Sequence, residues 1–597
     1  MKKKIMLAGL ASLALSAASY AGVKYIGTTG GTASSIVDLA VPSVDGVSYT
    51  EAAFEAAFGG DYTDAASAVN GVPTWQLTTT DQYVLEDIVA IANGNLIIDA
   101  GVIVRGQPRT NAGVFDAGTL LITAGSKLIA AGESTNPIVF TTASTTGGAT
   151  GGRASGAAPI FWDQPGVLVP KSAEVAGLWG GVIILGKAPT NADRDAGFVA
   201  ASPGLNAVGT AGKGTREQVI FGYGTGALKN TFSGTYTDNT TYSGLTTTAI
   251  TDDRSSIEGI PATASIALNG LDRFGGFESD DNSGILKFAS IRHGGVNLAA
   301  NSEVNGLTLG SVGRGTTISY VEVYGNTDDG FEMFGGTVNC DHLVVIGQQD
   351  DALDFDVGYA GTIQFALVVG GITGDKLLEW DGDYELETVN GFAVSSPASV
   401  GRAPAGNFAV YNATLIGNTL NGNHGLNLRS QVAARLVNSL VVNPRSSLID
   451  VDNLVAAGER NATNKFAVGI SKFVGVSFYK NGTIGVANWV AGGSDDVTVE
   501  TALALPAFAN KFDSASNSFP GLTTLASTAL TGGQNISVVP NSGTANAGAL
   551  DSVLDDGSLS ANATIQFVNY RGAFATDTAE LWTSGWTAAA LANVIQP

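Results

Sequence analysis

The hydrophobic positions in the middle of the chain repeat at a nearly constant interval. Apolar–polar–apolar triplets begin at Leu307, Phe331, Leu353, Leu378, Leu426 and Ile449, which are 24, 22, 25, 48 and 23 residues apart. Such alternation is typical of a β-strand with one buried face. A period in the low twenties, made of short strands, is typical of a solenoid. The interval of 48 residues predicts one extra insertion, which we place at residues 382–406.

The same period occurs earlier in the chain. Residues 94–106 (GNLIIDAGVIVRG) and 118–132 (GTLLITAGSKLIAAG) superpose with an offset of 24 residues. No period contains a helical segment, so a repeat of alternating strands and helices does not fit. A sandwich gives no reason for one face pattern to recur at one offset. The pattern therefore predicts an all-β fold, a right-handed parallel β-helix with three-strand rungs of about 22–25 residues.

The regions around the repeats suggest a domain organisation. Residues 1–21 have a basic start, a short apolar run and a small-x-small cleavage site, which predicts a secretory signal peptide. Residues 22–80, with a short helix expected at 48–60, are interpreted as an N-terminal cap, and residues 81–490 as the β-helix body. Residues 190–255 read as a second insertion. Residues 491–597 are expected to form a C-terminal region and cap packed around Trp582 and Trp586.

Composition and charge narrow the class of partner. The chain has 79 glycines, only 14% charged residues and a net charge of −23, which argues against nucleic acid and anionic membranes as partners. The single cysteine, Cys340, excludes an internal disulfide and reads as a buried apolar residue. The three histidines, His293, His342 and His424, lack the spacing of zinc ligands. After signal cleavage, no apolar segment is long enough to span a membrane.

Several longer strings resemble a known family. They are GLWGGVIILGKAPTN at 177–191, SIEGIP at 256–261, DDNSGILKFASIRHGG at 280–295, NTDDGFEMFGGTV at 326–338 and YRGAF at 570–574. They are similar to a largely uncharacterised family of secreted bacterial right-handed parallel β-helix proteins, often exported to the cell surface. The resemblance implies the same fold and a secreted, extracellular or cell-surface location on a bacterium. It implies little about chemistry.

Carboxylates occupy the polar positions of the repeating triplets. We call Glu332, Asp354, Asp356, Glu379 and Asp381 the acidic ladder. Stacked rungs would place neighbouring carboxylates about 4.8 Å apart, where two like charges repel by about 3 kcal/mol at an effective dielectric of 20. Arg429 is expected to cover Asp381 only. The ladder is therefore a candidate calcium site, because calcium takes six to eight oxygen ligands; a solvated acidic face is the alternative.

The turn residues before two of these strands are also acidic. Asp328 and Asp329 precede one strand, and Asp350 and Asp351 precede the next. Aspartates in turns commonly hydrogen-bond their own backbone, so a structural role is the first interpretation.

Two functions follow from these features. The first is an exported structural or adhesive protein that binds glycan or other matrix material and is stabilised by a cation, because solenoid flanks suit extended ligands. The alternative is a calcium-dependent polysaccharide lyase or glycoside hydrolase that uses carboxylates of the ladder with Arg429. An enzyme of this kind would need an aromatic-lined cleft beside the ladder.

Overall fold

The structure is a computed structural model. It describes residues 22–26, 43–44, 47–48, 74–79, 81–92, 94–109, 117–148, 160–164, 170–190, 231–235, 241–246, 255–260, 271–276, 278–297, 303–382, 388–389, 392–393, 407–418, 425–429, 432–444, 448–451, 462–467, 469–479, 490–491, 499, 502–505, 508–513, 522–523, 525, 528–540 and 565–597.

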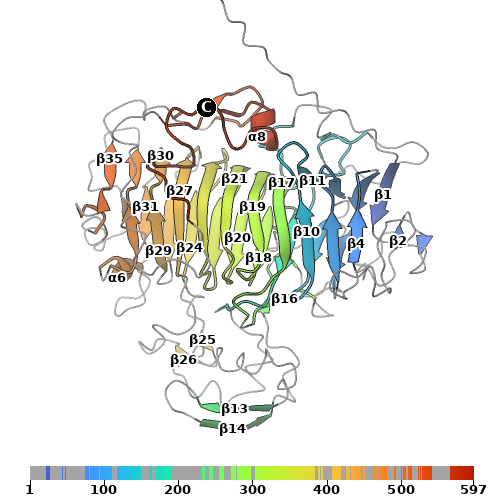
Figure 1. The fold of residues 1–597 in the computed structure, drawn as a ribbon, viewed down its shortest axis with the longest axis horizontal. Coiled ribbons are helices and arrows are strands. Elements are labelled where there is room, and N and C mark those ends of the chain that lie inside the picture. The colour runs from blue at the N-terminus through green and yellow to red at the C-terminus, as the bar shows by residue number, and fades with distance from the viewer. Residues whose placement is uncertain are drawn as a thin grey trace, which may run out of the picture.

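A sheet of ten parallel strands forms one face of a long coil (Figure 1). We call it the ladder sheet, because it carries the acidic ladder. Its strands, in order along the coil, are β6 (Ile88–Ile91), β9 (Thr119–Ile122), β12 (Val182–Leu185), β18 (Leu307–Gly310), β20 (Phe331–Phe334), β22 (Leu353–Asp356), β24 (Leu378–Asp381), β28 (Leu426–Arg429), β31 (Ile449–Val451) and β34 (Val490–Ala491).

The remaining two faces belong to a second, bent sheet. Its long strands cross both faces; they are β17 (Gly284–Gly294), β19 (Thr317–Asn326), β21 (Cys340–Gln348), β23 (Thr362–Val369) and β27 (Asn407–Ile416). On one face, the long strands are preceded along the coil by β4 (Thr74–Leu77), β7 (Asn95–Ile98) and β10 (Lys127–Ala131) and followed by β29 (Ala433–Val437) and β32 (Lys472–Val474). On the other face, they are preceded by β1 (Gly22–Ile26), β5 (Asp81–Leu85), β8 (Ile103–Gly106) and β11 (Ile138–Thr142) and followed by β30 (Leu440–Val442), β33 (Ser477–Tyr479) and β35 (Lys511–Asp513).

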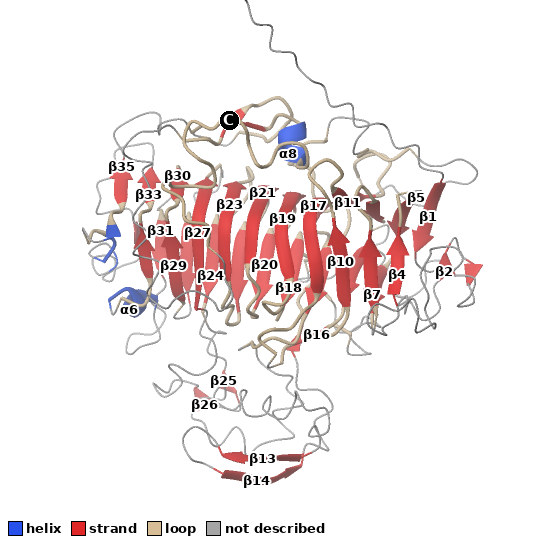
Figure 2. Ribbon diagram, viewed as in Figure 1, coloured by secondary structure: helices blue, strands red, loops and turns tan. Residues whose placement is uncertain are grey.

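Each rung therefore contributes one strand to each of three faces, and the predicted right-handed parallel β-helix is confirmed. Strands lie side by side along the whole length of the coil, with very little helix among the described residues (Figure 2). The helices are α6 (Ala462–Ala467) and α8 (Ala588–Leu591). Helix α6 adds Phe466 to the core, where its ring packs at right angles on Phe473.

The bend in the second sheet coincides with a left-handed, non-glycine residue at the same place in each long strand. Phe288, Tyr320, His342, Phe365 and Asn412 have φ between 45° and 61°. Bulky residues rarely adopt this conformation, because the side chain crowds the following carbonyl. Stacking offsets part of this strain: the ring centroids of Tyr320 lie 4.4 Å from Phe288 and 4.1 Å from His342. The rings of Phe288, Tyr320, His342 and Phe365 thus form a continuous stack along the bend.

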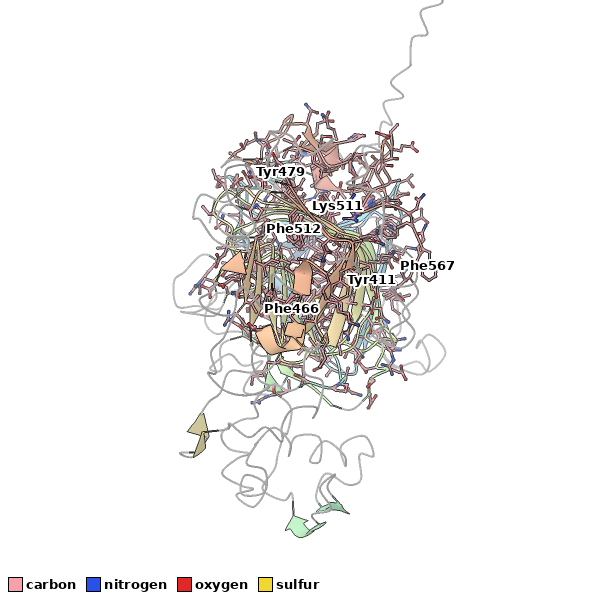
Figure 3. The ribbon with its side chains drawn as sticks, turned by 90° about the vertical axis from the view of Figure 1, so that its left-hand side faces the viewer. Tyr411, Phe466, Tyr479, Lys511, Phe512 and Phe567 are labelled. Carbon is pink, nitrogen blue, oxygen red and sulfur yellow. The ribbon has the colours of Figure 1, made fainter. Side chains whose placement is uncertain are left out.

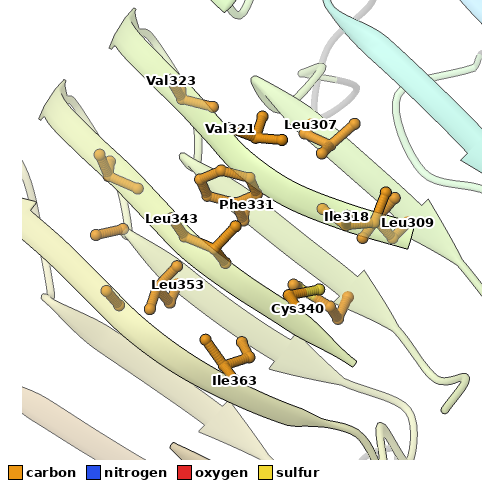
Figure 4. Packing of buried hydrophobic residues seen from close by; sticks show 14 of the residues in the cluster. Leu307, Leu309, Ile318, Val321, Val323, Phe331, Cys340, Leu343, Leu353 and Ile363 are labelled. Atoms are coloured by element: carbon orange, nitrogen blue, oxygen red, sulfur yellow. The ribbon is translucent and has the colours of Figure 1, made fainter. Parts of the chain in front are cut away.

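The interior is filled by the inward side chains of the three faces. Leu353, Phe355, Leu378 and Trp380 are each 0% exposed and belong to one large cluster, as their alternation predicted. Figure 4 shows Leu307, Phe331 and Leu353 meeting side chains of the opposite sheet such as Leu343. Burying a large apolar side chain contributes about 1.5–3 kcal/mol, so the repeating triplets are the main stabilising element of each rung.

Short antiparallel pairs lie outside the parallel coil. In the insertion predicted at 190–255, β13 (Thr231–Thr235) pairs with β14 (Thr241–Thr246), and at its end and beyond it β15 (Ser255–Ser256) pairs with β16 (Arg273–Phe274). In the insertion predicted at 382–406, β25 (Thr388–Val389) pairs with β26 (Phe392–Ala393). At the start, β2 (Ser43–Val44) pairs with β1 and with β3 (Val47–Ser48). The expected signal peptide and the helix expected at 48–60 lie outside the described residues.

The C-terminal region differs from the expected cap. Strand β35 and the core residues Val499 and Leu503 continue the coil beyond Val490. Figure 3 looks onto this end of the coil and shows Phe466 and Phe512 within its outline and Phe567 at its outer edge. The later residues that the structure describes lie along the flank of the coil, above β21, β27 and β30 in Figure 1, and Trp586 belongs to their packed cluster, with Trp582 against it.

Candidate functional site

The acidic ladder lies on the outward face of the ladder sheet, in the predicted register. Glu332 pairs with Asp354, and Asp354 pairs with Glu379, on β20, β22 and β24. In the neighbouring column, Asp381 pairs with Arg429 of β28. The apolar residues on either side of Glu332, Asp354 and Glu379 belong to the core, so the period of two along each strand forces these carboxylates outward.

Two cations lie at one end of the ladder. Arg429 contacts both Glu379, at 2.7 Å, and Asp381, at 3.4 Å, so the expectation that it covers Asp381 only is wrong. Lys376, which the sequence analysis did not select, lies 3.2 Å from Glu379 and 2.7 Å from Asp375. Burial alone would raise the pKa of Glu379; a hydrogen bond from Asp351, with the charges of Lys376 and Arg429, instead lowers it to about 2.

The turn residues beside the ladder form a second column with a structural role. Asn305 Oδ1 accepts the backbone N–H of Asp329 at 3.2 Å, Asp329 Oδ1 accepts that of Asp351 at 2.8 Å, and Asp351 Oδ1 accepts that of Lys376 at 2.6 Å. Each side chain thus bonds to the backbone of the next rung. A hydrogen bond contributes about 0.5–1.5 kcal/mol, so this turn column connects successive rungs. Asp329 and Asp351 therefore have a structural role, but they bond the backbone of the next rung and not, as was expected, their own.

The ladder and the turn column converge. In three groups, one carboxylate oxygen from each residue lies within 4.8 Å of the others; the groups are Asp328, Asp329 and Asp350; Asp329, Glu332 and Asp354; and Asp350, Asp351 and Asp375. Of the five ladder residues, Glu332 and Asp354 therefore lie in such a group. Asp356, Glu379 and Asp381 do not, and the last two face Arg429.

The group of Asp329, Glu332 and Asp354 is the most buried of the three. Asp329 and Glu332 are each 6% exposed, and Asp354 Oδ1 is buried without a hydrogen-bond partner. Burial first, and then the neighbouring carboxylates, raise the pKa of all three groups well above the usual range. Burial and mutual repulsion thus favour the protonated forms of these carboxyl groups unless a cation faces them.

Further acidic residues surround this group. The charges of Glu258 and Glu303 contribute to the raised pKa of Asp328, after burial and Asp350. Glu258 stands in the string SIEGIP, and Glu303 lies in the segment between β17 and β18. The repeat could not reveal them, because neither occupies a triplet. Asp375 and Lys376 precede β24 at the turn position of Asp350 and Asp351, and that alignment is the signal that could have found them.

The other candidate groups are packed into the fold. Cys340 is buried, as expected, and burial raises the pKa of its thiol. His342 lies in the stack along the bend, next to Phe365. Burial lowers the pKa of His293, whose Nδ1 contacts the carbonyl of Val175 at 2.6 Å. His424 lies outside the described residues.

The aromatic residues described near the ladder are also buried. Phe334 and Phe274 pack on each other with ring centroids 6.1 Å apart, and Trp380 points into the core. The part of the chain that the structure describes therefore shows no exposed aromatic surface beside the ladder. Within the same residues, no helix is both long and apolar enough to cross a membrane.

Comparison with protein-family models matches residues 244–515 to the family described as pectate-lyase-like beta helix domain. This range contains the whole acidic ladder. The comparison with curated proteins found no match. Among solved structures, the crystal structure of a periplasmic alginate epimerase matches 68% of this chain and 72% of its own, with 10% identity and a TM-score of 0.22, a likeness too distant to support any inference. By its strand architecture and the match over 244–515, the chain belongs to the parallel β-helix proteins.

Proposed function

We propose that the protein is an exported polysaccharide-binding protein of the cell surface or extracellular space. Its ladder sheet holds divalent cations, most simply calcium, through which an acidic glycan attaches to the coil. The observation that carries this proposal is the convergence of Asp329, Glu332 and Asp354, whose carboxylate oxygens lie within 4.8 Å of one another. The family name of the matched domain, which refers to pectate lyases, supports a polysaccharide as the ligand.

A cation removes the electrostatic cost of this arrangement. Two unit charges about 4.8 Å apart repel by about 3 kcal/mol at an effective dielectric of 20. Calcium accepts carboxylate oxygens in a flexible shell of six to eight ligands, so it takes the place of the protons that Asp329, Glu332 and Asp354 otherwise hold. A bound cation also offers open positions to the carboxylates of an acidic glycan, which the net charge of −23 would otherwise repel.

A polysaccharide lyase or glycoside hydrolase is the second candidate. Asp354 and Glu379 pair on adjacent strands, and their pKa values move in opposite directions, as in many acid–base pairs. Against catalysis, Lys376 and Arg429 both contact Glu379. The charges of Asp351 and Glu379 outweigh the effect of burial and raise the pKa of Lys376, so this lysine is a poor base. We therefore place binding first.

Calcium titration of matched variants tests the cation site. A ligand that binds only the folded state adds about 2.7 kcal/mol at a hundredfold excess over its Kd. Calcium is expected to raise the Tm of the wild type, and Glu332→Gln with Asp354→Asn is expected to abolish the rise. The control is Asp280→Asn with Asp341→Asn, which removes the same charge at side chains that are 71% and 47% exposed. Equal rises in both double variants would contradict the site.

A glycan panel tests the function. The wild type should retain acidic polysaccharides in calcium and release them on chelation, whereas the site variant should retain none. Chain length of the bound glycan is measured in the same samples. Shortened chains that depend on Asp354 and Glu379 would favour the enzyme, and calcium-independent retention would contradict a cation bridge.

A further inference from the structure

The flank of the coil carries an apolar strip that the C-terminal region covers. We call the described residues 522–523, 525, 528–540 and 565–597 the C-terminal brace. The strip consists of outward side chains of the bent sheet, and the brace covers it with buried apolar residues of its own. The strip includes Val344, Ile346, Leu367, Val369, Ile416, Leu440 and Val442, and the brace contributes Leu530, Phe574, Leu581, Trp586, Val594 and Ile595.

The brace is attached by hydrogen bonds without strand pairing: among the described residues, most involve side chains, and two are backbone bonds, from Gly572 N–H to Asn438 O at 2.8 Å and from Ala173 N–H to Leu530 O at 3.1 Å. Among the described pairings, its strands β36 (Ile536–Ser537) and β37 (Ile595–Gln596) pair with each other and with no strand of the coil. The side chain of Asn418 donates to the carbonyl of Thr528 at 2.7 Å and accepts the N–H of Thr528 at 2.8 Å. Gln364 does the same with Gln566, at 2.8 Å for both bonds. The ladders of the coil are therefore complete without the brace.

Two buried ionic groups also anchor the brace. Arg571 of the brace donates to Ser477 Oγ and to the carbonyl of Ala509, both at 2.8 Å, and Glu322 of the coil accepts from the brace. Glu322 of β19 is 0% exposed. Its Oε2 accepts the backbone N–H of Ala588 at 2.6 Å, and its Oε1 accepts that of Ala589 at 3.0 Å. The third donor comes from the coil: Ser290 Oγ–H donates to Oε2 at 2.5 Å and in turn accepts Arg292 Nε–H at 2.8 Å. Two of the three donors to this buried carboxylate thus belong to the brace.

We propose that the C-terminal brace is a conformational device that undocks from the finished coil as a unit, and that the bonds from Glu322 to Ala588 and Ala589 hold it closed. A buried carboxylate is tolerated only when hydrogen bonds replace its hydration. Glu322 has that replacement while the brace is docked, and undocking returns it to water. Segments with few ladder bonds open at lower free energy than the strands beneath them.

Hydrogen exchange of the full-length protein tests this proposal with one substitution in the coil and one in the brace. Glu322→Gln keeps the shape of the side chain but turns an amide N–H toward a backbone N–H. Ala588→Pro removes one donor from the brace and leaves the coil unchanged. Proline suits this position, because Ala588 is the first residue of α8, and Thr587 before it is extended (φ −85°, ψ 146°).

Each variant has a matched control. Asp280→Asn removes a carboxylate of the coil far from the brace, and Ala588→Gly retains the N–H that Ala588→Pro removes. Both Glu322→Gln and Ala588→Pro are expected to speed amide exchange at Ala592 and Val594. The N–H of Ala592 donates to the carbonyl of Ala588 at 2.8 Å, and that of Val594 donates to the carbonyl of Ala589 at 2.9 Å. The expected change is at least tenfold, which corresponds to about 1.4 kcal/mol. The amides of β21 and β23 should exchange at the wild-type rate.

Three outcomes would overturn the proposal. Acceleration in β21 and β23 equal to that in the brace would show that the brace does not open separately. Unchanged exchange in the brace would show that Glu322 does not hold it. Additive effects in the double variant Glu322→Gln with Ala588→Pro would show that the two substitutions act independently. If Glu322→Gln does not fold, Ala588→Pro against Ala588→Gly decides the question alone.

Discussion

Asp328 illustrates how the surroundings of one residue set its charge. Burial, and after it the charge of Asp350, raise the pKa of Asp328 to about 7. A carboxyl group whose pKa is higher in the folded state stabilises that state below its unfolded pKa, near 3.9. This contribution is lost as the pH rises through about 7. The charge of Asp328 is therefore set by its neighbours on other rungs, which no local sequence window contains.

The pH dependence of stability should reveal this residue. In calcium-free buffer, we expect the free energy of unfolding of the wild type to fall between pH 5 and pH 8, because Asp328 and its neighbours lose protons. Asp328→Asn should flatten this fall, since an amide does not titrate. Urea titrations across this pH range measure both slopes, and parallel slopes in the two proteins would refute the assignment.

Phe331 is a simpler case, because its role follows from alternation alone. It is 0% exposed and packs in the core between the sheets (Figure 4). Phe331→Ala is expected to lower the free energy of unfolding by about 3–5 kcal/mol, through lost burial and the cavity it leaves. A urea titration that gives a loss below about 1 kcal/mol would show that the site collapses around the gap or that Phe331 is not core.

Single residues could be placed from the sequence wherever the period of two applied. The inward positions of Leu353, Phe355 and Trp380 and the outward positions of Glu332 and Asp354 all follow from it. Lys376 and Glu258 could not be placed, because they lie in connecting segments. The fold alone decides which rung a connecting segment approaches.

At the scale of elements, the turn column connects the rungs by one repeated contact. Asn305 and Asp329 hold the N–H of the next turn in the same way, although only Asp329 can ionise. Ionisation of Asp329 is thus unnecessary for this bond, and an ionised Asp329 repels Glu332 and Asp354.

A pair of substitutions at Asp329 separates the bond from the charge. In calcium-free buffer, Asp329→Asn should leave the protein as stable as the wild type or more so, because it keeps the acceptor and removes repulsion. Asp329→Ala should cost about 1–3 kcal/mol, since the N–H of Asp351 loses its partner. Thermal unfolding compares the two, and an equal loss in both would mean that the carboxylate itself is required.

The bends were not evident from the sequence for a different reason. Left-handed backbone usually signals glycine or asparagine, yet Phe288, Tyr320 and Phe365 occupy such positions here. Their stacking partners lie on other rungs. The apolar strip, in contrast, did leave a signal. The runs in β21 and β23 are apolar at consecutive positions, which is typical of strands buried on both faces.

At the scale of the whole molecule, a constant offset was sufficient to predict the architecture. A coil of stacked rungs repeats the same local contacts, so one period describes most of them. The position of the C-terminal brace cannot be derived from this period. Its contacts join residues that are hundreds of positions apart, such as Ser172 and Leu530. The brace crosses many rungs, but each of its contacts occurs only once, so a repeat in the sequence cannot predict them.

The order of the chain gives the brace a consequence for biosynthesis. Every strand of the coil precedes residue 514, whereas the residues that cover the apolar strip follow residue 521. A newly made chain therefore contains all the described strands of the coil before it contains the cover of the strip. During that interval, it presents a row of aliphatic side chains at rung spacing, a surface prone to adhesion between copies. The speed of the last folding step, rather than that of coil assembly, sets how long a nascent molecule needs protection by chaperones.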